Sequence, residues 1–325
     1  MMPEKLKRGD EIRVIAPSRS MGLISEESKR VAIRRLEELG LKVTFSDHVD
    51  EMNEFSSSKI SSRVEDLHMA FSDKNVKAIL TVIGGFNSNQ ILEYLDYKLI
   101  KSNPKILCGY SDITALSNAI FAKTGVVTYS GPNFSSFGML KGFEYSLEYF
   151  KRCLFEKGPI TVRPSEEWSD DEWYKDQNDR EFIKNTGHFL INKGEAEGTI
   201  IGANLVTFQH LAGTPFMPSF KNSIVFVEDD YEERPHHFDS TLIALSLLPQ
   251  FSEVRGVVIG RFQRESGIER ETLTKTIKTN KKFDDIPVIA GVDFGHTAPQ
   301  ITFPIGGKAR LVAERDNLEL EILEH

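Results

Sequence analysis

The stretch KAILTVIGG, residues 77–85, decides the fold, because a strand-length apolar run passes directly into a pair of glycines. A continuous apolar run bounded by a turn signal is typical of a strand buried inside a sheet. Glycines at its end allow the backbone to approach a ligand closely. The stretch therefore predicts a buried strand with a candidate site at its carboxyl end.

The same alternation of apolar runs and amphipathic stretches continues on both sides of this strand. Ser25 has the character of an N-cap, and Gly40 supplies a C-terminal stop for the helix that follows it. The predicted strands of this half are residues 11–18, 41–45, 77–83 and 105–108, and the predicted helices are 25–40, 61–72 and 112–123. This alternation predicts an α/β fold with a mostly parallel sheet covered by helices.

A change of composition interrupts this pattern. Residues 166–181 contain eight acidic and two basic residues without apolar periodicity, as expected of a linker or an exposed loop. Strand-like runs then return with fewer helices between them. Because 325 residues suffice for about two domains, we expect an N-terminal domain over 1–165, a linker and substrate loop over 166–193, and a C-terminal domain over 194–325.

Charge and cysteine content exclude several classes of protein. The net charge is −8 and the isoelectric point is near 5.6, so no general positive field exists for nucleic acid or an anionic membrane. Two cysteines, Cys108 and Cys153, are too few for a disulfide framework or a four-thiolate metal site. The N-terminus lacks the apolar region of a signal peptide. We expect a cytoplasmic protein with no nucleic-acid or membrane partner.

Ser111 is the candidate nucleophile. It lies in GYSDI, residues 109–113, at a predicted strand-to-helix turn that projects the serine hydroxyl above the sheet. The next backbone N–H, that of Asp112, points into the same space. Isoleucine replaces the second glycine of the usual G-x-S-x-G pattern, and the alternative is that Ser111 or Asp112 only caps the following helix.

The glycine pair at residues 84 and 85 is a second element of the candidate site. Its backbone can present an N–H to a developing oxyanion, although it lacks the spacing of a phosphate-binding loop. The alternative is a tight turn between a strand and a helix.

A serine nucleophile needs a base and a carboxylate that orients the base. His296 follows a buried strand among small residues, and Glu228 ends the apolar run 224–227 at a strand tip. The alternatives are an ordinary loop histidine and a surface acid. Residues 235–239, PHHFD, contain three potential metal ligands and are the competing candidate, but adjacent histidines on one element do not readily face one ion. We expect no metal and no cofactor, and interpret this segment as the start of a helix.

Several motifs together resemble one known family. They are VIAPS (14–18), GGFNS (84–88), GYSD (109–112), GANL (202–205), VED (227–229) and FGHT (294–297). In order and spacing they resemble the LD-carboxypeptidase family of serine peptidases over nearly the whole chain, and within it the microcin C immunity branch, called MccF-like.

The resemblance implies a fold and roles. The expected N-terminal domain is flavodoxin-like or class I amidotransferase-like, the C-terminal domain is a swivelling β/α unit, and dimers are usual. Ser111 would be the nucleophile, His296 the base, Glu228 its partner, and the N–H groups of Gly85 and Asp112 the oxyanion hole. The expected substrate-binding residues are Gly84, Trp168, Trp173, Asn204, Glu232 and Arg234.

The resemblance leaves two activities open. One branch removes terminal D-alanine from murein tetrapeptides, and the other cleaves aminoacyl or peptidyl nucleotide conjugates with tryptophans stacked on the base. Both tryptophans, Trp168 and Trp173, lie in the acidic segment, which favours the second activity; the alternative is packing against the domain edge. A third hypothesis is an inactive binding protein that uses the same cleft.

Overall fold

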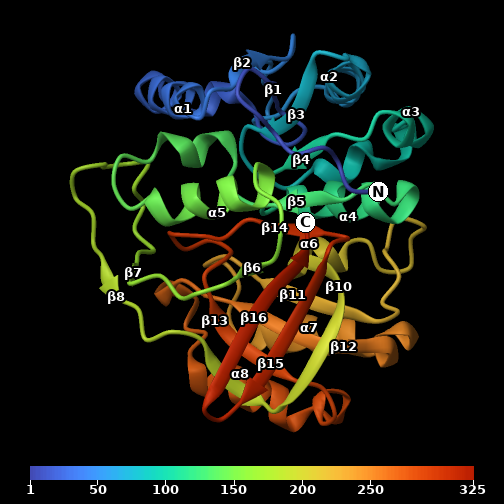
Figure 1. Cartoon of the computed structure of the whole chain (residues 1–325), viewed down its shortest axis with the longest axis vertical. Coiled ribbons are helices and arrows are strands. Elements are labelled where there is room, and N and C mark those ends of the chain that lie inside the picture. Colours follow the sequence, from blue (N-terminus) through green and yellow to red (C-terminus); the bar gives the residue numbers. More distant parts are fainter.

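The computed structural model describes residues 1–325, and two sheets lie one beyond the other along its longest axis (Figure 1). The first sheet has six strands, β2 (Lys42–Phe45), β1 (Glu11–Ile15), β3 (Val76–Thr81), β4 (Ile106–Cys108), β5 (Thr128–Ser130) and β14 (Phe303–Ile305), in that order. The first five are parallel, and β14 is antiparallel to β5. The order 2-1-3-4-5 is that of flavodoxin-like folds, which confirms the predicted class of the N-terminal sheet.

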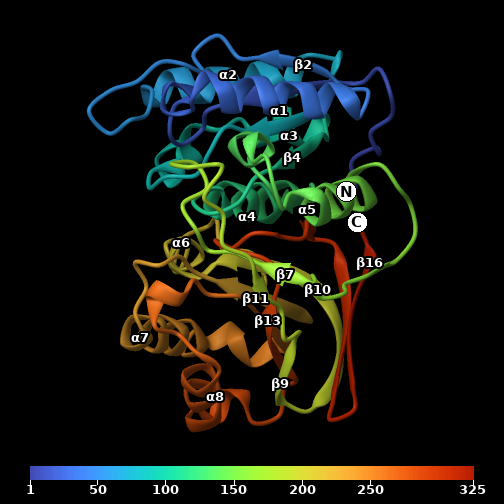
Figure 2. The same cartoon turned by 90° about the vertical axis from the view of Figure 1, so that its left-hand side faces the viewer.

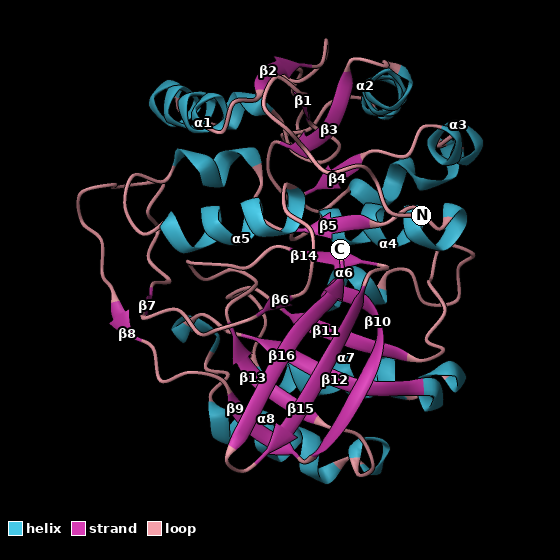
Figure 3. Ribbon diagram, viewed as in Figure 1, coloured by secondary structure: helices cyan, strands magenta, loops and turns pink.

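Helices cover both faces of this sheet, as the amphipathic pattern predicts (Figure 3). They are α1 (Glu26–Glu38), α2 (Ile60–Ser72), α3 (Tyr97–Ser102), α4 (Ile113–Thr124) and α5 (Glu144–Leu154). The Ser25 side chain accepts a hydrogen bond from the Ser28 N–H at the start of α1, so the predicted N-cap is confirmed. Gly125 ends α4 with a φ of 72°, a conformation that glycine adopts at little cost.

The second sheet has eight strands. Their order is β6 (Ile160–Thr161), β16 (Asn317–Glu324), β15 (Lys308–Glu314), β10 (Gly194–Asn204), β11 (Ser223–Glu228), β12 (Val254–Gly260), β13 (Val288–Val292) and β9 (Phe189–Asn192). Strands β10 to β13 are parallel and the flanking pairs are antiparallel. The remaining helices are α6 (Leu205–Gln209), α7 (Pro235–Ser246) and α8 (Arg270–Thr279), and Figure 2 shows α7 and α8 on one side of this sheet.

The chain exchanges short strands between the two sheets. Strand β6, from the predicted N-terminal range, joins the second sheet, and β14, from the predicted C-terminal range, joins the first. One hydrophobic core also contains residues of both sheets, among them Leu80 and Phe226. The predicted division at residues 165 and 194 stays a prediction, because paired strands cross it in both directions.

A short hairpin begins in the acidic segment and ends just beyond it. Strand β7 (Glu167–Trp168) pairs with β8 (Ile183–Lys184), placing Trp168 opposite Ile183. The interpretation of residues 166–193 as a linker and substrate loop stays a prediction, and the sequence did not indicate this hairpin, because a single cross-strand pair of large side chains leaves no periodic signal. Short 3₁₀ helices complete the fold at Met21–Leu23, Ser88–Tyr94, Phe134–Gly138, Pro249–Glu253, Arg264–Ser266 and Lys281–Phe283. None of the helices has the length and apolar character needed to cross a membrane.

Candidate active site

Ser111 stands at the turn between β4 and α4, at the carboxyl end of the first sheet. Its φ is 65°, in the left-handed region that residues other than glycine rarely occupy. A Cβ placed on Gly84 would lie 2.8 Å from the Ser111 Cβ, so only glycine fits opposite this serine. Asp112 makes no side-chain cap to α4, which argues against the helix-cap alternative for that residue.

His296 and Glu228 come from the second sheet and meet Ser111. The His296 Nε2 is 3.0 Å from the Ser111 Oγ, and the His296 Nδ1 is 2.8 Å from the Glu228 Oε2. Glu228 is the last residue of β11 and is buried, whereas His296 lies in the loop after β13. A Cβ on Gly295 would lie 2.4 Å from the Glu228 Oε2, so a glycine is needed beside the carboxylate. The three side chains form one continuous chain of hydrogen bonds.

The carboxylates around His296 set the proton affinity of its imidazole. Burial lowers the pKa of His296, but the charge and hydrogen bond of Glu228, with Asp230 and Asp229 nearby, outweigh burial and raise the pKa to about 9. The carboxylate therefore stabilises the imidazolium, as a base that stores a proton during a reaction requires.

Two backbone donors lie next to Ser111. The N–H groups of Gly85 and Asp112 donate to no acceptor within the chain, so both are free to hold a negatively charged oxygen. The Asp112 carboxylate accepts from the backbone N–H groups of Asn87 and Ser88, at 3.0 and 2.8 Å. This contact joins the turn that carries Ser111 to the loop that carries the glycine pair.

Two of the remaining predicted binding residues, Asn204 and Arg234, already have side-chain partners within the chain. The Asn204 Oδ1 accepts from the Thr207 N–H at the start of α6, and its Nδ2 donates to the Asp229 Oδ1 at 2.9 Å. Arg234 lies 3.8 Å from the Glu265 carboxylate, and Glu232 is exposed. No hydrogen bond joins Glu232 or Arg234 to the Ser111, His296 and Glu228 chain.

The two tryptophans are both half-buried but differ in their surroundings. The Arg261 guanidinium lies 4.9 Å from the centre of the Trp168 ring, and Arg261 also binds the buried Asp293, three residues before His296. Trp173 packs against the core that both sheets share. Packing within the chain therefore covers part of each tryptophan ring. A backbone bridge between Ser169 and Ala298 joins the loop that carries both tryptophans to the loop that carries His296.

Reasoning from the sequence missed several neighbours of these groups. The Tyr110 ring centroid is 5.4 Å from that of His296, and the Arg19 Nε donates to the Gly84 carbonyl at 3.1 Å. Arg19 directly follows the VIAPS motif, and this position was the signal in the sequence that could have identified it.

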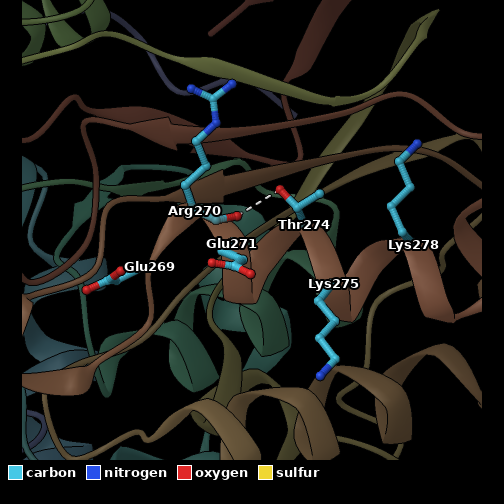
Figure 4. A pocket seen from close by; sticks show the side chains of 6 residues that line it. All are labelled: Glu269, Arg270, Glu271, Thr274, Lys275 and Lys278. Atoms are coloured by element: carbon cyan, nitrogen blue, oxygen red, sulfur yellow. Dashed lines mark hydrogen bonds between the residues drawn. The ribbon is translucent and has the colours of Figure 1, made fainter.

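Two other candidate sites are the histidine pair on α7 and an open depression along α8. His236 and His237 stack with ring centroids 4.1 Å apart on α7, and no group of three or more metal-ligating side chains could hold an ion. An open depression along α8 contains no hydrophobic side chain and none of the predicted site residues (Figure 4). In Figure 4 the Thr274 hydroxyl donates to the Arg270 carbonyl, so the helix itself uses this polar group.

Comparison with protein families matches both halves of the chain. The model described as the LD-carboxypeptidase N-terminal domain covers residues 12–131, and the LD-carboxypeptidase C-terminal domain covers 197–311. The putative carboxypeptidase YocD of Bacillus subtilis is 51% identical over 100% of both chains. A probable murein peptide carboxypeptidase of the same organism is 30% identical over 95% of this chain and 91% of its own.

Solved structures agree with these matches. An MccF-like protein from Bacillus anthracis has a TM-score of 0.99 and 53% identity, with 100% of each chain covered. MccF in complex with glutamyl sulfamoyl guanosine has a TM-score of 0.90 and 28% identity, covering 99% of this chain and 98% of that one. These proteins thus have the same fold as this chain over essentially its whole length.

Proposed function

Since this chain belongs to the LD-carboxypeptidase family, we propose that it is a serine-type peptidase or amidohydrolase with Ser111 as nucleophile, His296 as base and Glu228 as its orienting acid. The single observation that carries the proposal is the hydrogen-bonded chain from Glu228 through His296 to Ser111, at 2.8 and 3.0 Å. In such an arrangement the carboxylate selects the imidazole tautomer that leaves Nε2 free to accept a proton.

The proposed reaction passes through a covalent ester. The His296 Nε2 takes the proton of the Ser111 hydroxyl while Oγ attacks the carbonyl carbon of the scissile amide. The N–H groups of Gly85 and Asp112 hold the resulting oxyanion. His296 gives its proton to the leaving nitrogen, the amine departs, and a water molecule repeats the same steps to release the acid and restore Ser111. No metal or cofactor takes part in this scheme.

Labelling with a fluorophosphonate tests the nucleophile directly, because this reagent phosphonylates activated serines. The intact protein should gain one adduct, and peptide mapping should place it on Ser111. Absence of an adduct at that serine would favour the alternative of an inactive binding protein that uses the same cleft.

For the substrate we propose aminoacyl or peptidyl nucleotide conjugates of the sulfamoyl adenosine type. Support comes from the MccF complex with glutamyl sulfamoyl guanosine and from the two tryptophans in the loop bridged to the His296 segment. The alternative is release of terminal D-alanine from murein tetrapeptides, favoured by the relative named a probable murein peptide carboxypeptidase. In either case we propose a cytoplasmic homodimer with a small-molecule substrate, and Gly84, Asn204, Glu232 and Arg234 among the residues near it.

The acidic loop offers a way to distinguish these substrates. Alanine in place of Trp168 or Trp173 should reduce kcat/KM for an aminoacyl sulfamoyl adenosine by about 1–3 kcal/mol, or roughly 5- to 150-fold, because a stacking face is lost. Murein tetrapeptide has no such face and should be nearly unaffected. We would measure kcat/KM for both substrates, with thermal melts as the folding control and Trp168→Phe as the variant that keeps a ring.

Two results would contradict this assignment. Equal losses on both substrates would indicate that the tryptophans support the fold alone. A wild-type preference for murein tetrapeptide would replace the nucleotide conjugate with the murein substrate and leave the nucleophile unchanged.

The pH dependence of turnover should reflect the high proton affinity of His296. Its pKa is raised to about 9, so the imidazole is mostly protonated at neutral pH and cannot take the serine proton. We therefore expect kcat/KM to keep rising with pH above the ordinary value of 6.5, to reach half of its plateau near pH 9 and to level off only at higher pH. Measurement from about pH 5 to about pH 10, with circular dichroism at each pH, would check this.

The same pH profile measured on Glu228→Gln shows in which direction the Glu228 carboxylate shifts the pKa of His296. Burial, which lowers the pKa of His296, would then act without the carboxylate, and the rising limb should move to lower pH. A rising limb at the same pH in both proteins would show that another group controls it.

A further inference from the structure

The peptide unit between Gly84 and Gly85 contributes its N–H to the proposed oxyanion hole and accepts a hydrogen bond from Arg19 at its carbonyl oxygen. Its N–H belongs to Gly85, the proposed donor, and its carbonyl oxygen belongs to Gly84. The Arg19 Nε donates to that carbonyl at 3.1 Å. In a trans peptide the C=O and N–H bonds point in opposite directions, so a group that fixes the carbonyl also fixes the direction of the N–H.

Apart from the bond to Arg19, this peptide forms no hydrogen bond within the chain, so packing is the other contact that holds it. Neither flanking residue has a side chain, and glycine permits many backbone conformations. Close neighbours require the glycines: a Cβ on Gly84 would lie 2.8 Å from the Ser111 Cβ, and one on Gly85 would lie 2.3 Å from the Ser18 Oγ and 2.8 Å from the Arg19 Cγ. The unit is therefore packed between the serine turn and the segment that carries Arg19.

Arg19 is well placed to act on this peptide. Its backbone forms an isolated bridge with Ser57, and its guanidinium lies 5.7 Å from the centre of the Phe86 ring. No carboxylate lies within ion-pair distance of it, although the chain forms many such pairs. Its charge thus acts on the Gly84 carbonyl, and a charge-assisted hydrogen bond polarises the peptide and makes its N–H a stronger donor.

We propose that Arg19 is a positioning residue that aims and polarises the Gly84–Gly85 peptide, so that the Gly85 N–H stabilises the oxyanion formed when Ser111 attacks. The inference rests on the proposed function and adds a residue to its machinery. Arg19 acts here through the peptide and forms no bond to the reacting atoms.

The test compares Arg19→Ala, Arg19→Gln and Arg19→Lys with the wild type. The readouts are the second-order rate of fluorophosphonate labelling, which does not depend on the natural substrate, and kcat and KM for the best substrate. Removal of one oxyanion donor typically lowers kcat by about 100- to 1000-fold. Arg19→Ala keeps the Gly85 N–H but no longer fixes its direction, so it should lower kcat by less, roughly 10- to 100-fold. KM should change by less than about threefold, and the pH of the rising limb should not move.

Arg19→Lys and Arg19→Gln distinguish the effect of a positive charge at the Gly84 carbonyl from the effect of a hydrogen-bond donor alone. Lysine supplies a charged donor to the Gly84 carbonyl and should recover part of the rate, whereas glutamine supplies only a neutral one and should recover less. If Arg19→Ala fails to fold, this order of Lys above Gln still decides the question, and the reverse order would overturn the proposal.

Arg35 provides a matched control. It also donates to backbone carbonyls, those of Phe137, Met139 and Leu140, and its guanidinium lies 5.0 Å from the centre of the Phe143 ring. Arg35→Ala should lower the melting temperature without changing the labelling rate of the folded protein.

The possible failures are distinguishable. A wild-type protein that does not react with the fluorophosphonate would overturn the proposed function and this inference together. A reactive wild type with Arg19→Ala labelled within about twofold of it would overturn the inference alone. A loss confined to KM would also overturn it, because Arg19 would then bind substrate directly.

Discussion

Replacing Ser111 with alanine is expected to abolish turnover and leave the fold intact. The hydroxyl is the proposed nucleophile, and loss of a member of such a triad typically costs about four to six decades of rate. Alanine carries the same Cβ as serine, so it adds no contact with the glycine loop at this left-handed position. Steady-state turnover and a thermal melt of the purified variant are the measurements.

The control for this prediction is a preparation free of wild-type enzyme, because a trace contamination would mimic residual activity. A variant that retains more than about a tenth of the wild-type kcat would remove Ser111 from the role of nucleophile.

Glu228→Gln is expected to cost about four decades of kcat with little change in shape. The glutamine amide has the size of the carboxylate, but it can place an N–H donor against the His296 Nδ1. This favours the tautomer in which Nε2 carries the proton and cannot act as the base. It also removes the negative charge that stabilises the imidazolium, 2.8 Å away in the wild type.

A second histidine and carboxylate pair provides the control for this substitution. The His48 Nδ1 lies 2.8 Å from the Asp66 Oδ1. Asp66 is on α2, and His48 is in the loop before this helix. Asp66→Asn removes the same kind of charge from the same kind of pair, so it should reduce stability and leave kcat unchanged. Equal losses of kcat in the two variants would indicate a general effect of burying an amide and would argue against an orienting role for Glu228.

The parts of the fold that could be predicted are those with local signals. The apolar run 77–83 and the N-cap Ser25 depend on neighbouring residues only, and both elements form where the pattern places them. The predicted contact of Ser111 with His296 depended on the family resemblance, because 185 positions separate these residues in sequence. The local pattern made His296 a candidate among eight histidines, because it follows a buried strand among small residues, but it left an ordinary loop histidine as the alternative.

The features that could not be predicted depend on partners distant in sequence. The ring of Trp168 lies against Arg261, and no pattern around either residue indicates the other. The role we propose for Arg19 depends on the direction of one carbonyl group, which a sequence does not encode locally. Strand β14 has only three residues, too few for a periodic signal to assign it to the first sheet.

The exchange of β14 also determines how the molecule would behave if it were divided. Residues 303–305 cover the outer edge of β5, so a fragment that ends before them would expose a row of unpaired N–H and C=O groups on that strand. Bare edges of this kind pair with other chains, and an isolated N-terminal half should therefore aggregate. The segment from β13 to β14 crosses from the second sheet to the first and carries His296 on the way. The imidazole is thus anchored on both sides, and strand pairing as well as side-chain contact opposes its separation from Ser111.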